Sequence, residues 1–144
     1  EVMDAAPAGT IGGTFCGNPV AAAAALAVMD VMKRDDYAGK ARHIGETVTA
    51  RYKELQKKYS VIGDVRGLGA MIGLELVKDK ETKEPATEIA GKLIQNAIQK
   101  GLLLEGCGTA GNVIRFLAPL TMTDEQMEKG LEIFEEALKE ALEA

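Results

Sequence analysis

The sequence predicts an α+β fold in which helices pack on a small sheet. Apolar residues recur every three or four positions through residues 36–59 and 127–142, which is the spacing of an amphipathic helix. Through residues 70–76 they alternate, which is the spacing of a strand with one buried face. The expected order is helix, helix, strand, helix, strand, strand, helix, and this order favours a helical layer on a sheet.

Composition narrows the classes of partner. The 144 residues carry a formal charge of -5, and acidic and basic residues are interspersed without a basic block. We therefore expect no nucleic-acid partner and no anionic membrane surface. The apolar stretch 20–29 ends at Asp30 and is shorter than the roughly 20 residues of a membrane span. Cys16 and Cys107 have neither the spacing of a metal site nor the density of a secreted disulfide scaffold, so we expect a cytoplasmic protein.

The first residues predict a loop followed by a tightly packed helix. Residues 1–19 are rich in Gly, Ala and Thr and lack hydrophobic periodicity, and a loop of this length in a compact domain is usually functional or docked elsewhere. We therefore expect the chain to start partway through a larger protein. Asn18 as N-cap and Pro19 at the first position start a helix through 20–33, and its apolar residues surround it. Burial between domains or subunits is expected.

The remaining elements follow from local signals. Glycines predict a turn over residues 63–69, before the strand at 70–76. A third helix is expected over 87–100, with Gly101 as its left-handed C-terminal cap.

Two strands and a last helix complete the chain. The apolar runs 102–104 and Val113–Leu117 predict strands, separated by a turn over residues 106–112. Thr123 and Gln126 have the spacing of a capping box, which predicts the start of the last helix.

A glycine-rich segment at residues 12–19 is a candidate anion site. It directly precedes a helix, so its backbone amides and the Thr14 hydroxyl are suited to a phosphate. The alternative is a flexible lead-in capped by Asn18, and spacing alone favours that alternative, because the segment matches neither the P-loop nor the dinucleotide fingerprint.

Arg115 is the second candidate. It lies inside the strand Val113–Leu117, where an unpaired guanidinium is costly, so it needs an anion. A bidentate contact to a substrate carboxylate is one solution. The pattern alone favours an exposed sheet face or an Asp or Glu of the same chain.

Other polar residues suggest structural roles. We expect Arg66 to bond backbone carbonyls of its turn, with carboxylate binding as the alternative, and Glu75 to face solvent or a nearby cation. His43 is the single histidine and is expected on the surface, so no metal site is predicted. None of the lysines has the apolar setting of a buried Schiff-base amine.

Three segments together point to a family. Residues 12–21, 62–76 and 112–121 closely resemble class III aminotransferases, in order and in separation. The resemblance runs from Thr10 to the last helix and is greatest to the 4-aminobutyrate branch.

The resemblance implies fold type I architecture and a pyridoxal 5'-phosphate cofactor. Residues 1–34 correspond to the end of the large cofactor domain, and residues 35–144 to the C-terminal small domain. Gly13 and Thr14 would bind the cofactor phosphate of the neighbouring subunit, and Arg115 would bind the substrate carboxylate. A homodimer or higher homo-oligomer is therefore implied.

The implied reaction is ping-pong amino transfer from 4-aminobutyrate to 2-oxoglutarate. The family's Schiff-base lysine falls before this segment, so no catalytic residue is expected here, and the chain alone is expected to be inactive. Other ω-amino acids, ornithine and acetylornithine are alternative donors, since their enzymes share the pattern. Cys16, and the pair at 109–110, depart from the family pattern at the phosphate loop and near the substrate entrance.

A rival hypothesis from another class is a free-standing, non-catalytic α+β module. Under that hypothesis, the strand that carries Arg115 would bind a small carboxylate or support dimerisation. The loop-like start of the chain argues against it.

Overall fold

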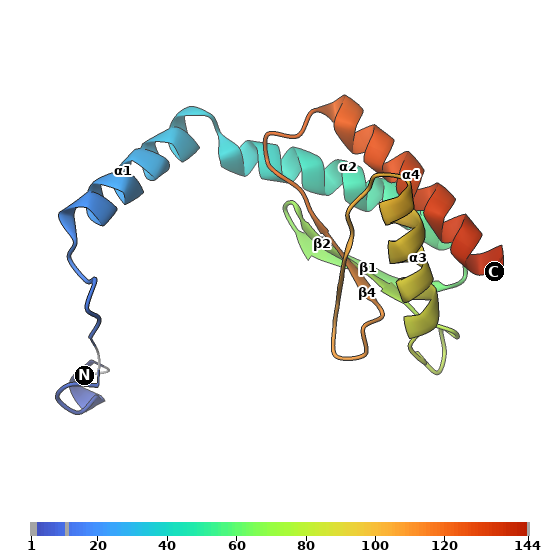
Figure 1. Cartoon of the computed structure of the whole chain (residues 1–144), viewed down its shortest axis with the longest axis horizontal. Coiled ribbons are helices and arrows are strands. Elements are labelled where there is room, and N and C mark those ends of the chain that lie inside the picture. The colour runs from blue at the N-terminus through green and yellow to red at the C-terminus, as the bar shows by residue number, and fades with distance from the viewer. Residues whose placement is uncertain (1–2, 11, 144) are drawn as a thin grey trace. The chain divides into compact units, whose positions relative to one another are not determined.

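The computed structural model describes residues 3–10 and 12–143 and divides the chain into two compact units, Glu1–Asp36 and Tyr37–Ala144. The first contains a short 3-10 helix, η1 (Met3–Ala5), and α1 (Pro19–Arg34). The second contains the strands of the described residues and the other helices (Figure 1).

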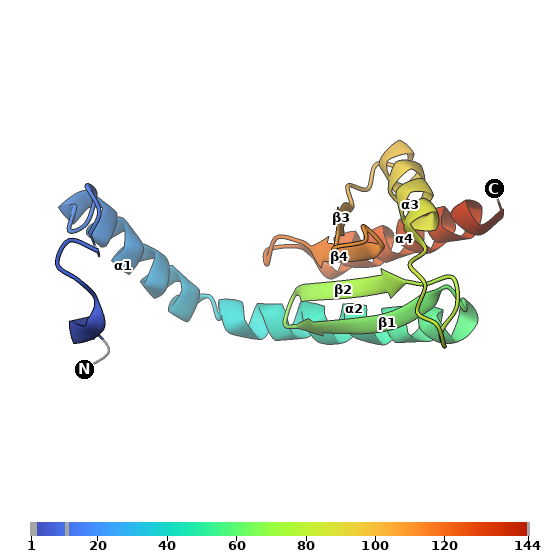
Figure 2. The same ribbon diagram turned by 90° about the horizontal axis from the view of Figure 1, so that it is seen from below.

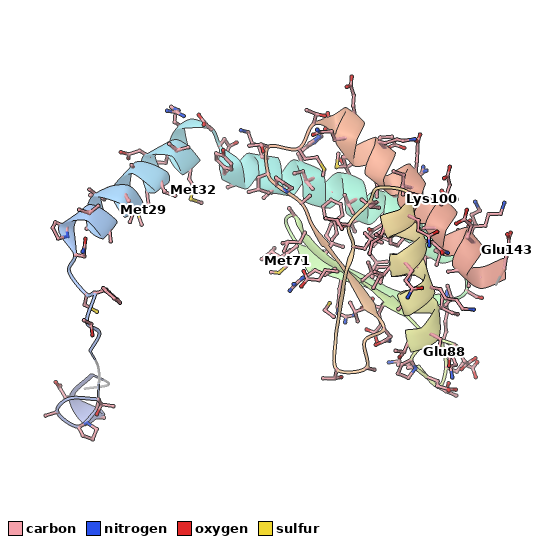
Figure 3. The ribbon with its side chains drawn as sticks, in the orientation of Figure 1. Met29, Met32, Met71, Glu88, Lys100 and Glu143 are labelled. Carbon is pink, nitrogen blue, oxygen red and sulfur yellow. The ribbon has the colours of Figure 1, made fainter. Side chains whose placement is uncertain are left out.

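The helix α1 begins where the sequence predicts. The Asn18 side chain accepts hydrogen bonds from the amides of Val20 and Ala21, at 3.0 and 3.1 Å, and Pro19 occupies the first helical position. No residue of α1 is buried within this unit. Met29 and Met32 are among its exposed apolar side chains (Figure 3). The helix therefore presents apolar surface on all sides.

The second unit is a four-stranded antiparallel sheet in the order β1-β2-β4-β3, with three helices packed on it (Figure 2). The strands are β1 (Ile62–Leu68), β2 (Met71–Leu76), β3 (Glu105–Cys107) and β4 (Val113–Leu117). The helices are α2 (Tyr37–Lys58), α3 (Thr87–Gln99) and α4 (Asp124–Glu143). The α+β prediction is confirmed.

One face of the sheet forms the core. Alternate residues of β2, namely Ile72, Leu74 and Leu76, are almost completely buried and belong to one cluster with the apolar stripes of α2, α3 and α4. The opposite face, which carries Met71, Gly73 and Glu75, is exposed or half-buried. Residues on that second face are available for contacts outside the core.

The predicted helix caps are confirmed. The Thr123 amide donates to Gln126 Oε1 at 3.1 Å, and the Gln126 amide donates to Thr123 Oγ1 at 3.2 Å, which is a reciprocal capping box. Gly101 has a φ of 86° after α3, as a left-handed cap requires.

The prediction of a turn over residues 63–69 is wrong, because most of this segment is the strand β1. Its glycines permit close approach between strands: a Cβ at Gly67 would lie 2.3 Å from the Met71 carbonyl oxygen. The actual turn is confined to Gly69 and Ala70, and Gly69 has a φ of 54°. The glycine-rich composition therefore reflects tight packing in the hairpin as well as turning.

The strand predicted at 102–104 is also wrong. The paired strand is β3 (Glu105–Cys107), which falls partly inside the segment expected to turn. Leu102 and Leu104 still pack against the core, but without a ladder. The apolar run therefore indicates burial here, whereas strand pairing depends on the register with β4.

Candidate functional site

Arg115 is the central residue of β4 and projects from the face of the sheet opposite the core. Its neighbour Ile114 is fully buried in the core, so the alternation of the strand directs Arg115 the other way. Arg115 is paired in register with Gly73 of β2 on one side and Glu105 of β3 on the other. Its half-buried side chain therefore lies between a residue without a side chain and an acid.

Glu105 is the anion that Arg115 contacts. Arg115 Nη2 lies 2.5 Å from Glu105 Oε2. This hydrogen bond and the charge of Arg115 hold the pKa of Glu105 below its ordinary value, and the same contact raises the pKa of Arg115. The structure thus contains the intramolecular acidic partner that the sequence pattern favoured.

The guanidinium of Arg115 is only partly satisfied. Its Nε is buried and has no hydrogen-bond partner among the described residues 3–10 and 12–143. A guanidinium binds a carboxylate most strongly through two parallel N–H donors, and Glu105 contacts Nη2. Binding capacity therefore remains on Arg115.

A cavity of about 410 Å3 adjoins this ion pair. Its wall is mainly apolar and is formed by residues 102–104, the end of β4 with the loop after it, the first half of α4 and Tyr52 of α2. Its polar members are Tyr52, Glu105, Arg115 and Gln126. The volume falls within the roughly 300–1,000 Å3 of small-molecule sites. The core residues Tyr52, Phe116 and Phe134 line this cavity, so it extends from the core to the strand that carries Arg115.

Arg66 lies on the same face of the sheet as Arg115 but has other partners. Its Nη1 donates to Asp64 at 2.8 Å and to Glu75 at 2.6 Å. The prediction that Arg66 bonds backbone carbonyls of a turn is therefore wrong, whereas the predicted pairing of Glu75 with a nearby cation is confirmed. The two carboxylates raise the pKa of Arg66, Asp64 having the larger effect.

The glycine-rich segment of the first unit forms a turn in which Thr14 is exposed. The Cys16 amide donates to the Gly13 carbonyl at 3.0 Å, and Gly17 takes a φ of 76° before the helix. Asn18 engages the amides of α1, as in the helix lead-in alternative. A phosphate would therefore rely on the Thr14 hydroxyl and the turn backbone, and the exposure of Thr14 fits that role.

The predicted site residues are divided between the two units. Gly13 and Thr14 belong to the first, and Arg115 belongs to the second. The phosphate-binding and carboxylate-binding candidates are therefore carried by separate parts of the chain.

No lysine of the chain has the desolvated setting of a Schiff-base amine. All the lysines lie in the described residues, and every one is exposed except Lys100, which is half-buried. Lys100 Nζ lies 2.9 Å from Glu140 and 3.6 Å from Glu136, and these contacts raise its pKa. An amine held protonated in this way is a poor nucleophile.

The structure offers neither a metal cluster nor a membrane span in its described part. Over residues 3–10 and 12–143, no group of three or more His, Cys, Asp and Glu side chains could hold a metal ion. His43 is exposed and contacts Asp124, with Nε2 2.8 Å from Oδ1. Within the same described ranges, no helix has the length and apolarity needed to cross a bilayer.

Sequence reasoning missed Glu105. Its role depends on the register of β3 with β4, and the misplaced strand at 102–104 concealed that register. One signal was present: Glu105 is an acid between an apolar run and a glycine, ten residues before the unexplained Arg115. A hairpin of that spacing places the two residues opposite each other.

Known proteins are similar to this chain in sequence. The sequence model of the class-III aminotransferase family matches residues 1–138. 5-Aminovalerate aminotransferase DavT of Pseudomonas aeruginosa is 47% identical over 97% of this chain and 33% of its own length. 4-Aminobutyrate aminotransferase GabT of Escherichia coli is 42% identical over 98% of this chain and 33% of its own length.

A solved structure agrees with these sequence matches. An amine transaminase from an uncultivated Pseudomonas species, solved in the PLP-bound form, matches with a TM-score of 0.80 and 34% identity over 92% of this chain and 30% of its own length. This chain spans about a third of the length of the curated relatives it matches. With the family match covering residues 1–138, the α+β fold and its sequence identify the chain as belonging to the class-III aminotransferase family.

Proposed function

We propose that the protein to which this chain belongs is a pyridoxal-phosphate-dependent aminotransferase that transfers the amino group of 4-aminobutyrate to 2-oxoglutarate. Relatives named as 4-aminobutyrate and 5-aminovalerate aminotransferases, at 42% and 47% identity, support this class of donor. Both donors are ω-amino acids with a carboxylate at the far end of a short apolar chain. Residues 1–34 would end the cofactor domain, and residues 35–144 would form the small domain.

The observation that carries the proposal is the setting of Arg115. A half-buried guanidinium, held on a strand beside an apolar cavity of about 410 Å3, is suited to orient a substrate by its carboxylate. Its fixed position on a sheet would anchor the substrate carboxylate, and the length of the substrate chain would then set where the reacting amine lies. Orientation of this kind contributes to catalysis by lowering the entropic cost of the reaction.

Gly13 and Thr14 would hold the cofactor. The exposed Thr14 hydroxyl would donate to the phosphate of the neighbouring subunit's cofactor, and Gly13 would let the turn backbone approach it. Pyridoxal phosphate, when bound, supplies the electron sink for amino transfer. Because every lysine of this chain is solvated or ion-paired, we assign the Schiff-base lysine to residues other than these 144.

Association and location belong to the same proposal. The helix α1 has no buried residue in its own unit, and its apolar side chains surround it, which supports packing against another domain or subunit. We therefore propose a homodimer or a higher homo-oligomer, acting in the cytoplasm. Cys16 and Cys107, both free, suit a reducing compartment.

The names of the relatives indicate 5-aminovalerate as a second donor. The 5-aminovalerate aminotransferases are 47% and 48% identical to this chain, and the 4-aminobutyrate aminotransferases of Escherichia coli and Mycobacterium tuberculosis are 42% and 47% identical, so identity does not separate the two donors. The two donors differ by one methylene, for which a hydrophobic pocket discriminates by only about 10–200-fold. 5-Aminovalerate is therefore the first alternative, ahead of ornithine and acetylornithine.

The test is glutamate formation from 2-oxoglutarate by the complete protein with pyridoxal phosphate. 4-Aminobutyrate, 5-aminovalerate, ornithine and acetylornithine would be compared as donors, in the wild type and in Arg115→Ala. Arg66→Ala is the matched control, because Arg66 lies on the same sheet face with different acidic partners.

Each outcome has a distinct meaning. Turnover of 4-aminobutyrate that collapses in Arg115→Ala but survives in Arg66→Ala supports the proposal. Preference for another donor changes the substrate and keeps the reaction. A complete protein that binds carboxylates without binding the cofactor would instead support the non-catalytic module.

A further inference from the structure

The cavity beside β4 continues into the core and is lined by aromatic side chains. Tyr52 of α2, Phe116 of β4 and Phe134 of α4 all line it. The chain has three tyrosines and three phenylalanines, so half of its aromatic residues gather at this one cavity. Tyr52 and Phe134 belong to the buried core, whereas Arg115 projects from the opposite face of the sheet. The inner part of the cavity therefore lies on the core side of the sheet.

A cavity of this size is unusual inside a protein core. Interiors are packed closely and rarely leave more space than one water molecule needs, whereas this cavity has a volume of about 410 Å3. Met122 and Met127 also line it, and thioether side chains adapt to the shape of a ring and make favourable contacts with its edge. Gly130 of α4 adds no side chain to the wall. The cavity thus has the volume and the lining of a site for a small aromatic molecule.

The Tyr52 hydroxyl gives this lining a polar group at its buried end. Tyr52 is only 1% exposed, and none of the described residues 3–10 and 12–143 forms a hydrogen bond with its hydroxyl. Burial raises the pKa of this phenol, and no hydrogen bond adds to that effect. A buried polar group without a partner is costly, so such groups are normally satisfied by protein, water or ligand. A polar atom on a bound ring would supply the partner that Tyr52 needs.

The other polar groups of the lining favour an uncharged ligand. Glu105 and Arg115 neutralise each other through their ion pair. Gln126 already accepts the Thr123 amide in the capping box. A charged ligand would lose its hydration here without gaining a partner of opposite charge. A neutral ring with one polar substituent meets these constraints.

We propose that the cavity is a second binding site, for an uncharged aromatic molecule whose polar substituent forms a hydrogen bond with the Tyr52 hydroxyl. The ring packs against Phe116 and Phe134, and the substituent points toward α2. This site goes beyond the proposed function: it lies on the core side of the sheet, behind the carboxylate-binding end of Arg115, and its ligand takes no part in amino transfer.

The test is the binding of 4-fluorophenol to the complete protein loaded with pyridoxal phosphate, followed by fluorine NMR titration. This probe is uncharged near neutral pH, because a phenol ionises only near the pKa of tyrosine. 4-Fluorotoluene is the matched probe, since a methyl group replaces the hydroxyl at almost the same size. Both are measured without amino donor or acceptor, so the result does not depend on turnover.

Three substitutions locate the probe. Tyr52→Phe removes only the hydroxyl and keeps the ring that packs on Phe134. Tyr37→Phe is its matched control, because it removes a hydroxyl from the same helix but not from the cavity wall. Gly130→Met adds a side chain to the wall: its Cβ would lie 3.7 Å from Leu102 Cδ1, an ordinary contact, and its remaining atoms would occupy the cavity. Thermal unfolding of each variant checks that the fold is kept.

The two probes should respond differently to these substitutions. Tyr52→Phe should weaken the binding of 4-fluorophenol about two- to tenfold, the effect of losing one hydrogen bond, and should leave the binding of 4-fluorotoluene unchanged. Tyr37→Phe should match the wild type, and Gly130→Met should lose most of the binding of both probes. Unchanged 4-fluorophenol affinity in Tyr52→Phe, full binding in Gly130→Met, or no binding by the wild type overturns the inference.

The inference and the proposed function fail separately. Arg115→Ala is expected to lose turnover of 4-aminobutyrate but to keep the binding of 4-fluorophenol, because the polar partner of the probe is Tyr52. Loss of the probe from Arg115→Ala would place it at the carboxylate site already described and overturn the inference. Probe binding that depends on Tyr52, in a protein that transfers no amino group, contradicts the proposed reaction and keeps this second site.

Discussion

Tyr52 of α2 and Phe134 of α4 lie with their ring centroids 4.9 Å apart and their planes tilted by 39°. Both side chains are almost completely buried. The pair joins helices that are far apart in sequence, on the buried face of the sheet. It adds ring-to-ring packing to the core, and burial raises the pKa of Tyr52 well above its ordinary value.

Loss of this contact should destabilise the second unit. Phe134→Ala is expected to lower the free energy of unfolding by about 3 kcal/mol, because it removes a buried ring and leaves a cavity. Chemical denaturation measures the change. Leu103→Ala is the control: Leu103 is 84% exposed, so its replacement should change the free energy of unfolding by less than about 0.5 kcal/mol. Equal effects of the two substitutions would contradict this packing.

Two glycines should respond to alanine in opposite directions. Gly67→Ala would place a Cβ 2.3 Å from the Met71 carbonyl oxygen, so it should destabilise the β1–β2 hairpin by about 1–3 kcal/mol. Gly91 lies inside α3, where an added Cβ would meet no neighbouring atom within 4 Å, so Gly91→Ala should stabilise the fold by up to about 1 kcal/mol. Thermal unfolding of both variants tests the pair. A neutral Gly67→Ala would rule out the close approach of the strands.

The capping box should contribute measurably to α4. Thr123→Ala removes the hydroxyl that accepts the Gln126 amide and is expected to cost about 1 kcal/mol. Thr109→Ala, in the exposed loop between β3 and β4, should be close to neutral and serves as the control. Adding Gln126→Ala gives a double-mutant cycle by denaturant unfolding. Strict additivity of the two substitutions would show that the reciprocal bonds do not act together.

Glu135 should make the stability of the fold depend on pH. A hydrogen bond from Lys58, the largest cause, lowers the pKa of Glu135 from its ordinary value of 4.5. A group with a lowered folded pKa stabilises the fold above its unfolded pKa, and this contribution is lost as the pH falls through the folded pKa. The stability advantage of the wild type over Glu135→Gln should therefore be full at pH 7 and shrink below about pH 4.5. Denaturant unfolding at several pH values checks this, and an advantage independent of pH would contradict it.

The helices were predictable from the sequence because their signals are local. Asn18, Thr123 and Gly101 act within a few residues of themselves, and the apolar stripes of α2 and α4 are long enough to distinguish a helix from a strand. The strands were less predictable. Gly67 is required by contact with a neighbouring strand, which composition does not distinguish from a turn.

The candidate site was likewise predictable only where its signals are local in the sequence. The need of Arg115 for an anion follows from its place inside a strand, and an acidic partner in the same chain was among the solutions. The identity of that partner as Glu105 required the register of β3 with β4. The roles of Gly13 and Thr14 in phosphate binding remain predictions that come from the family resemblance.

The strand order β1-β2-β4-β3 also has a consequence for how the molecule folds. Each outer pair is a hairpin of nearby residues, and isolated hairpins form in about 1–10 μs. The central pairing instead joins β2 to β4, which are separated in the chain by α3 and β3. Forming this pair therefore has to overcome the entropy of closing a much longer loop. The Glu105–Arg115 contact is therefore assembled in an early, local step, whereas its alignment with Gly73 and Arg66 waits for the slow one. Because the β3–β4 hairpin is already formed when β2 pairs with β4, substitutions that weaken this hairpin should slow folding and change the rate of unfolding little.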